Sequence, residues 1–415
     1  MSGAVSSSHR FGQSRVGVVL AVVLATIVSN LLLTSSSPAS AESGGVPPNP
    51  YIVPQVVDTN PDPDIVETVI VADEITIPDI GDGRGVINAM AYNGKIPGPE
   101  LRLKVGDTVK VHFFNQLDDE YTGIHWHGIE LANRSDGTQL VQNQVDPGES
   151  YIYEFTVTRP GIYWYHPHHH YSTNQVVKGL YGSLIVEDPN EDALVANGTL
   201  PPPENTHTLL VGDMTICKEP GSNDNVTYPN PGNTLPHVSG GTLPVQGAPR
   251  PIDLCQNSPF DKEGAPLGAP LPAGAIANVQ PQNQTVVNEG QTVVTNGVYV
   301  GGRSGNPRGG VALGALDQNG KALDVTPGEG LRLQLISPMQ VRYLRFLLTL
   351  EDGRIIPLVR IGGEGGLLNE AVLDGGTAAQ TGFNWEYDQG QIVLGPSERA
   401  DVVAAIPADA TGVAT

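Results

Sequence analysis

Basic residues are scarce in this sequence. Lysine and arginine number 22 against 44 aspartate and glutamate residues, which gives the 415-residue chain a formal charge of −22. Nucleic-acid binding requires basic patches that neutralise phosphates, so this charge argues against nucleic acid as a partner.

Helical periodicity is also lacking, because no stretch repeats its apolar residues at a spacing of 3.6. Glycine (50) and proline (35) are abundant and charged residues are few, a composition that suits a loop-rich all-β protein. Turn residues separate the strand-like stretches in the manner of a β-sandwich. The predicted strands are residues 67–77, 101–114, 151–157, 161–168, 181–187, 208–217, 292–300, 331–336, 341–350, 355–361 and 391–404.

Residues 1–41 have the features of a secretory signal peptide. A short basic region precedes an apolar run from Val16 to Leu33, and Ala39-Ser40-Ala41 supplies a small-residue cleavage site. A retained membrane anchor is the alternative, because the run approaches spanning length, but the polar pair Ser29-Asn30 favours cleavage. Residues 42–62 are expected to form a linker. We therefore expect an exported protein, periplasmic or extracellular, without stable membrane insertion.

Histidines alternate in two short stretches of the chain. In Gly-Ile-His-Trp-His-Gly, His125 and His127 share one face of a strand, because residues two apart point to the same side. In Tyr-Trp-Tyr-His-Pro-His, His166 and His168 do the same. Imidazole is the usual ligand for copper, zinc, nickel and non-haem iron. We expect the four rings to converge on one metal site; the alternative is surface or core histidines without a ligand.

The other histidines have no ligand spacing. His169 and His170 follow the second motif and are expected at a solvated strand end. The alternative for His170, which shares a strand face with His166 and His168, is a position that lines the site. His112, His207 and His237 are interpreted as ordinary residues.

The run from Leu101 to Asp188 resembles the first cupredoxin domain of the multicopper oxidases, the family of laccases and cuprous oxidases. The motifs HWHG and WYHPH, with the sequence between them, carry the resemblance. It implies that His125 binds the type 2 copper and His127 the type 3 pair. By the same resemblance, His166 and His168 are the remaining ligands that this domain gives to the trinuclear cluster.

Asp136 precedes a glycine between the two motifs. It resembles the family's acidic residue beside the type 2 copper, which helps deliver protons to oxygen. An ordinary Asp-Gly turn is the alternative.

Two domains are predicted, residues 63–190 and 205–415. The stretches 357–368 and 395–401 resemble the second domain of the same oxidases, so the resemblance implies tandem cupredoxin-like Greek-key β-sandwiches. The second unit lacks the histidine pairs and is interpreted as a spacer. Its strand pattern stops roughly two strands short of a closed sandwich, so we expect it to be incomplete and the chain to be a fragment.

An internal repeat supports a duplicated fold. Residues 105–111 line up with 327–333, and residues 147–151 line up less well with 396–400.

The chain contains only two cysteines, Cys217 and Cys255. Neither lies in a histidine-rich motif, whereas a blue copper centre needs a thiolate with two histidines. In an exported protein they are expected to form a disulfide across the long insertion at 218–289, worth roughly 4 kcal/mol on the chain-entropy model.

The resemblance implies a copper-dependent oxidoreductase that couples one-electron oxidation of a small molecule or metal ion to the reduction of O2 to water. The motifs HPxHxHG and HCHxxxH, which in the family supply the type 1 copper and the rest of the trinuclear cluster, do not occur in this sequence. Two alternatives stay open: a non-enzymatic exported copper-binding protein, and a mononuclear zinc protein that uses three of the four histidines.

Overall fold

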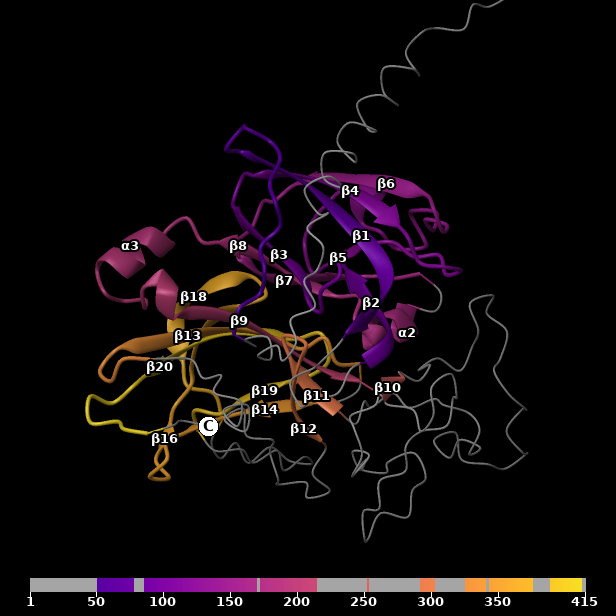
Figure 1. Ribbon diagram of the computed structural model, residues 1–415. Helices are drawn as coiled ribbons and strands as arrows, with labels where there is room; N and C mark the ends of the chain where they lie inside the picture. Colours follow the sequence, from indigo (N-terminus) through magenta and orange to yellow (C-terminus); the bar gives the residue numbers. More distant parts are fainter. Residues whose placement is uncertain are drawn as a thin grey trace, which may run out of the picture. The chain divides into compact units, whose positions relative to one another are not determined.

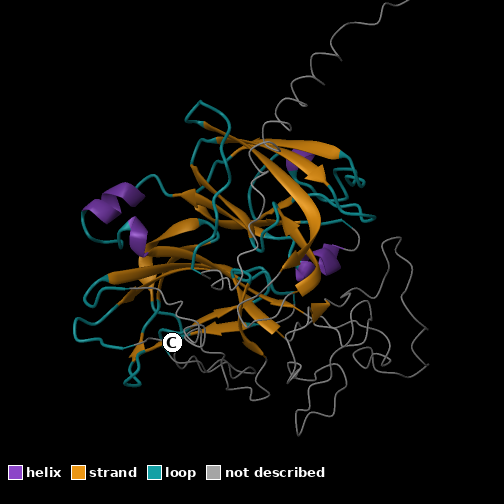
Figure 2. Ribbon diagram, viewed as in Figure 1, coloured by secondary structure: helices purple, strands orange, loops and turns teal. Residues whose placement is uncertain are grey.

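The computed structural model describes residues 51–77, 86–169, 172–214, 252–253, 292–302, 325–340, 343–375 and 389–412. Strands dominate this part of the chain and the few helices are short (Figure 2). The all-β fold is therefore confirmed. The predicted signal peptide, the two cysteines, His170 and His237 lie outside the described residues.

Strands between residues 65 and 187, together with the short β10 from the second half of the chain, form two sheets (Figure 1). One has the order β10-β2-β1-β4-β6, with β10 at Ile252–Asp253, β2 at Val86–Tyr92, β1 at Ile65–Ile77, β4 at Thr108–Asn115 and β6 at Ser150–Thr156. The other has the order β3-β8-β7-β5, with β3 at Gly98–Lys104, β8 at Gly182–Glu187, β7 at Gly161–His166 and β5 at His125–His127. Every second residue of β4 is buried, and Phe113, Trp126 and Tyr165 from the two sheets share one apolar core.

The second half of the chain is built around a seven-stranded sheet. Its order is β12-β11-β9-β13-β20-β17-β18, with β12 at Val298–Gly302, β11 at Thr292–Thr295, β9 at Thr206–Met214, β13 at Gly330–Ile336, β20 at Arg399–Ala405, β17 at Val359–Gly363 and β18 at Gly366–Val372. Two short antiparallel pairs accompany it, β14 (Leu344–Phe346) with β19 (Ile392–Leu394) and β15 (Leu348–Thr349) with β16 (Ile355–Ile356). A separate core forms here, with Leu335, Ile392 and Val402 fully buried.

The repeat in the sequence has a structural counterpart in the strand pairing. β4 pairs parallel to β1 and antiparallel to β6, and β13 pairs parallel to β9 and antiparallel to β20. The turn before the last of these strands also repeats: Gly148 N–H donates to Asn115 O at 2.8 Å, and Ser397 N–H donates to Ser337 O at 2.9 Å. Gly148 and Ser397 both have positive φ, +80° and +67°. The sequence match is weaker at this turn because serine takes the left-handed conformation that glycine adopts more readily.

An Asn-Gly pair repeats as well. Asn93 and Asn296 both have left-handed φ, +53° and +46°. Each side chain caps a neighbouring strand, since Asn93 Oδ1 accepts from Val71 N–H at 2.7 Å and Asn296 Oδ1 accepts from Leu210 N–H at 2.8 Å. Asn-Gly is a strong short-range turn signal and explains why the predicted strand 292–300 is in fact a hairpin.

The predicted strand 101–114 was also wrong as a single element. Gly106 has φ +104°, and the chain turns there between β3 and β4, which lie in different sheets. Three strands, β2, β10 and β18, were missed altogether.

Short helices are present although the sequence lacks helical periodicity. Helices α2 (Ser172–Lys178) and α3 (Glu191–Ala196) and the 3-10 turns η1 (Asn133–Ser135) and η2 (Pro203–Asn205) are present. With seven residues or fewer, each is too short to show a helical period in the sequence.

Polar and apolar contacts connect the two halves of the chain. Arg332 on β13 bonds to Asp401 on β20 and to Glu191 on α3, and all three groups are largely buried. Apolar side chains of β7 and β8 form one cluster with Leu210 and Ile336 from the second half. The domain boundaries at 190 and 205 remain a prediction.

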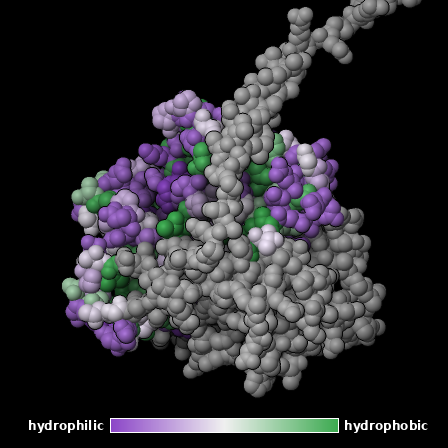
Figure 3. All heavy atoms as spheres, in the orientation of Figure 1, coloured by the Kyte–Doolittle hydropathy of each residue, from purple (hydrophilic) through white to green (hydrophobic). Residues whose placement is uncertain are grey.

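The described surface that faces the viewer in Figure 3 is mainly hydrophilic, with single apolar residues scattered over it. Within the described ranges, no helix combines the length and the apolar character needed to cross a membrane.

Candidate metal centre

Three of the four predicted histidine ligands lie on two paired strands. β5 and β7 run antiparallel, and the ladder places His125 opposite His166 and His127 opposite Trp164. Trp126, between the two histidines of β5, points into the core and is 1% exposed. The alternation predicted from the sequence therefore puts the two imidazoles of β5 on the face opposite the core.

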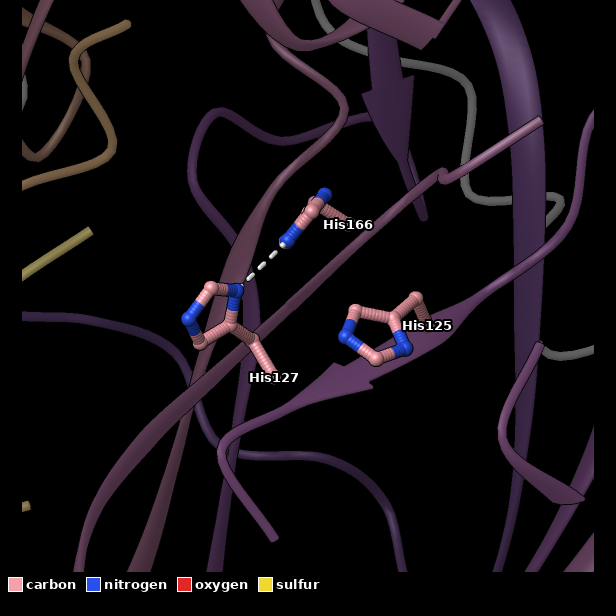
Figure 4. A group of neighbouring side chains, drawn as sticks. All are labelled: His125, His127 and His166. Carbon is pink, nitrogen blue, oxygen red and sulfur yellow. Dashed lines mark hydrogen bonds between the residues drawn. The ribbon is translucent and has the colours of Figure 1, made fainter. Parts of the chain in front are cut away.

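The imidazoles of His125, His127 and His166 converge (Figure 4). One potential ligand atom from each lies within 4.8 Å of the others. His127 Nδ1 and His166 Nε2 are 3.2 Å apart. A spacing of this order suits nitrogen ligands of a shared metal ion, which bind at about 2.0 Å each.

His168 joins the group from just beyond the end of β7. It is exposed and forms an isolated bridge with Thr138. Its ring centroid lies 5.0 Å from that of His125 and 5.9 Å from that of His166. All four predicted ligands are thus brought together, while their role as ligands remains a prediction.

Backbone carbonyls orient two of the rings. His125 Nδ1 donates to Asp136 O at 2.8 Å, and His166 Nδ1 donates to Pro167 O at 2.9 Å. A carbonyl can only accept, so the proton is on Nδ1 and the lone pair is on Nε2. Hydrogen bonds of this kind are the usual support of metal-binding histidines. Trp164 stacks on His166 with ring centroids 4.0 Å apart, which further limits rotation of that ring.

The three clustered histidines are held in the neutral form. Burial lowers the pKa of His127 to about 3, and the positive charge of Arg399 contributes to the same shift. Burial lowers the pKa of His166 well below its ordinary value, and the neighbouring histidines add to this. Burial also lowers the pKa of His125, against a smaller opposing effect of Asp136. Neutral imidazole is the form that binds metals, so little proton release opposes binding.

Asp136 lies next to His125 of the first motif. Its carboxylate Oδ2 accepts from the Thr138 hydroxyl at 2.7 Å, and Oδ1 is 3.7 Å from His125 Nδ1. The next residue, Gly137, has φ +77°, and a Cβ there would collide with the carbonyl of Ile124. The Asp-Gly turn and the position beside His125 are therefore both present, and the proton-delivery role stays a prediction.

His169 is not at a solvated strand end, contrary to expectation. It is 5% exposed and packs against Gly123, just before the first motif. β7 ends at His166, so His169 lies in the loop that follows the strand. This loop packs against the protein and buries the His169 side chain. His112 is bonded to Glu67 at 2.7 Å, away from the cluster.

Arg399 is a further residue at this site, and it was not predicted from the sequence. It comes from β20 in the second half of the chain, and its guanidinium reaches Gly128 and the carbonyl of Ile162 on β7. The stretch 395–401 was noted only for its resemblance to the family. Nothing in local sequence shows that this arginine approaches a histidine motif about 270 residues earlier.

Comparisons with known proteins identify relatives of the region that carries the histidine motifs. Residues 80–191 match the family model for multicopper oxidase. The chain is 41% identical over 109 residues to multicopper oxidase MmcO of Mycobacterium tuberculosis, covering 26% of this chain and 21% of that protein. It is 48% identical over 101 residues to L-ascorbate oxidase of Nicotiana tabacum, covering 24% and 17%. The match thus spans about a fifth of these relatives' length.

Solved structures extend the similarity of fold over most of the chain. A laccase from Pediococcus acidilactici aligns with a TM-score of 0.53 at 21% identity, covering 87% of this chain and 57% of that one. A multicopper oxidase from Campylobacter jejuni aligns with a TM-score of 0.51 at 20% identity, covering 86% and 53%. The fold is therefore cupredoxin-like. The resemblance of residues 80–191 to the multicopper oxidases is confirmed.

Proposed function

We propose that His125, His127, His166 and His168 bind copper as one half of a trinuclear site in an oxidase that couples one-electron oxidations to reduction of O2 to water. The convergence of three imidazoles within 4.8 Å, inside a multicopper oxidase domain, carries this proposal. In the family the other half of the cluster comes from motifs that this sequence does not contain.

The donor set suits copper. Only imidazole nitrogens form the cluster found among the described residues, and imidazole is a good ligand for copper in both of its oxidation states. Zinc also accepts imidazole, and a tetrahedral zinc site with three histidines and water is the second candidate. The fourth histidine, 5.0 Å from His125 between ring centroids, favours a larger site than one zinc ion needs.

When bound, copper supplies the redox chemistry, and the chain supplies orientation and protons. The carbonyl of Asp136 fixes the His125 ring, while the stacked Trp164 fixes His166. The Asp136 carboxylate lies close enough to hold or pass a proton beside His125. Its hydrogen bond from Thr138 keeps it in place, so we assign it the proton-delivery role.

The remaining features fit the same function. We propose that residues 63–190 form the copper-binding domain and residues 205–415 a spacer domain. We also propose export to the periplasm or the extracellular space, with signal cleavage after residue 41. The partners are O2 and a reducing small molecule or metal ion, with no nucleic acid.

Metal analysis of the full chain tests the proposal. Purified metal-free protein is titrated with copper and with zinc against chelators of known affinity, and the bound copper is examined by electron paramagnetic resonance. We expect copper to bind with nitrogen hyperfine structure and without the blue absorption of a type 1 centre. Preferential binding of one zinc ion would support the second candidate and overturn the copper proposal.

A further inference from the structure

Arg399 reaches the histidine site from the other half of the chain. It lies at the start of β20 and is 5% exposed. Its Nε donates to Ile162 O at 2.9 Å, and Ile162 belongs to β7, the strand that ends at His166. Its Nη1 donates to Ser397 O at 2.8 Å.

The same guanidinium packs against the turn that follows His127. Gly128 has φ +85°, and a Cβ at this position would collide with Arg399 Nη2. The positive charge of Arg399 also lowers the pKa of the His127 imidazole. Arg399 thus contacts the backbone of both histidine-bearing segments, one beside β5 and one on β7.

The charge of Arg399 is only partly balanced. Its ion-pair partner is Glu364, with Nη1 3.0 Å from Oε1, and the carboxylate of Glu398 also interacts with its charge. The side chain of Glu364 is 53% exposed, whereas that of Arg399 is 4% exposed. Water therefore screens the carboxylate more than the guanidinium, and a net positive potential remains on the buried side.

We propose that Arg399 is a positioning residue that fixes both histidine segments and biases copper at His127 towards the +1 state. This inference rests on the proposed copper site. A buried positive charge repels a doubly charged ion more than a singly charged one, so it weakens Cu(II) binding relative to Cu(I). Their affinity ratio sets the reduction potential of the bound copper.

Three substitutions separate charge from structure. Arg399→Gln removes the charge, and Arg399→Lys keeps it while losing the planar fork that bonds to Ile162. Glu364→Gln removes the exposed counter-charge and leaves Arg399 in place. Arg354→Gln is the control, because Arg354 pairs with Asp352 and Asp409 in an exposed loop.

The affinities of the full-length chain for Cu(I) and Cu(II) are measured separately, with chelator competition for each ion. In Arg399→Gln we expect the ratio of Cu(II) to Cu(I) affinity to rise at least about tenfold, which is the effect of a unit charge about 12 Å away at an effective dielectric of about 20. Glu364→Gln should move the ratio in the opposite direction. Arg399→Lys should keep the ratio and weaken binding of both ions, and Arg354→Gln should change nothing.

The outcomes separate a failure of this inference from a failure of the proposed copper-binding function. A wild-type chain that binds no copper overturns the proposed function and this inference with it. If the wild type binds copper and Arg399→Gln keeps the wild-type ratio, the inference alone is overturned. If Arg399→Gln does not fold, Glu364→Gln decides: a ratio shifted towards Cu(I) supports the inference, and an unchanged ratio overturns it.

Discussion

His125 on β5 lies directly opposite His166 on β7, with their ring centroids 5.4 Å apart. Antiparallel pairing thus sets the separation of two proposed ligands through backbone hydrogen bonds, independently of any metal. His127 is two residues further along the same face, and its Nδ1 reaches His166 Nε2. We therefore expect the histidine cluster to be largely preformed in the metal-free protein.

Replacing a clustered histidine tests ligation. His127→Ala and His168→Ala should each lower copper affinity at least about 100-fold, because removing a ligand costs more than loss of a supporting contact. His207→Ala is the control, since His207 lies on β9 outside the cluster. Chelator competition measures the affinity, and circular dichroism confirms folding. Equal losses in all three variants would indicate general unfolding.

Gly137 is predicted to be essential for the loop behind the first motif. Gly137→Ala should destabilise the protein by about 2–4 kcal/mol, because the new methyl group meets the Ile124 carbonyl at a positive φ. Gly148→Ala is a matched control with φ +80° and no atom within 4 Å of the added Cβ. Urea unfolding of both variants separates the collision from the backbone strain. Equal destabilisation of the two would contradict the packing explanation.

Replacing the buried Arg332, which pairs with Glu191 and Asp401, should lower the free energy of unfolding. Arg332→Met should destabilise the protein by about 3–5 kcal/mol, because it leaves the buried Asp401 without its charged partner. Burial already raises the pKa of Asp401, and Arg332 opposes that shift. Arg354→Met, in an exposed ion pair, should leave the free energy of unfolding nearly unchanged. Thermal unfolding compares the two, and a mild effect of Arg332→Met would be inconsistent with a buried pair.

Acid stability should depend on Glu67. Burial raises the pKa of Glu67, but hydrogen bonds from His112 and Lys110 outweigh it and lower the pKa to about 2. A carboxylate with a depressed pKa stabilises the fold above its unfolded pKa of about 4.3, and this contribution is lost as pH falls towards 2.

Glu67→Gln should therefore lose stability at pH 5 and lose little at pH 2. The expected difference is about 1–2 kcal/mol, reduced for solvent screening. Glu130→Gln, whose side chain is 65% exposed, serves as the control. Urea titrations across this pH range provide the measurement. A loss of the same size at both pH values would rule out the linkage.

Local sequence was sufficient to predict the strand character and the histidine alternation. Side chains two apart on a strand must share a face, so the grouping of His125 with His127 follows from covalent geometry alone. The repeat was also visible, since turn residues such as Gly148 are dictated by backbone conformation. The strand boundaries were predicted less well. At Gly106 the chain turns, so the predicted strand 101–114 is divided between two sheets.

The surroundings of the histidines depend on contacts between segments that are far apart in the sequence. His169 is buried because the loop after β7 folds against Gly123, a contact across 46 positions of the chain. Arg399 reaches the site because β20 is held beside β13 and β17 in a sheet of the other half. Local sequence is sufficient to predict the chemistry of the proposed ligands, since that chemistry belongs to residue types and their spacing. The potential and the orientation at those ligands were decided by long-range packing, because charges and carbonyls distant in sequence act through space.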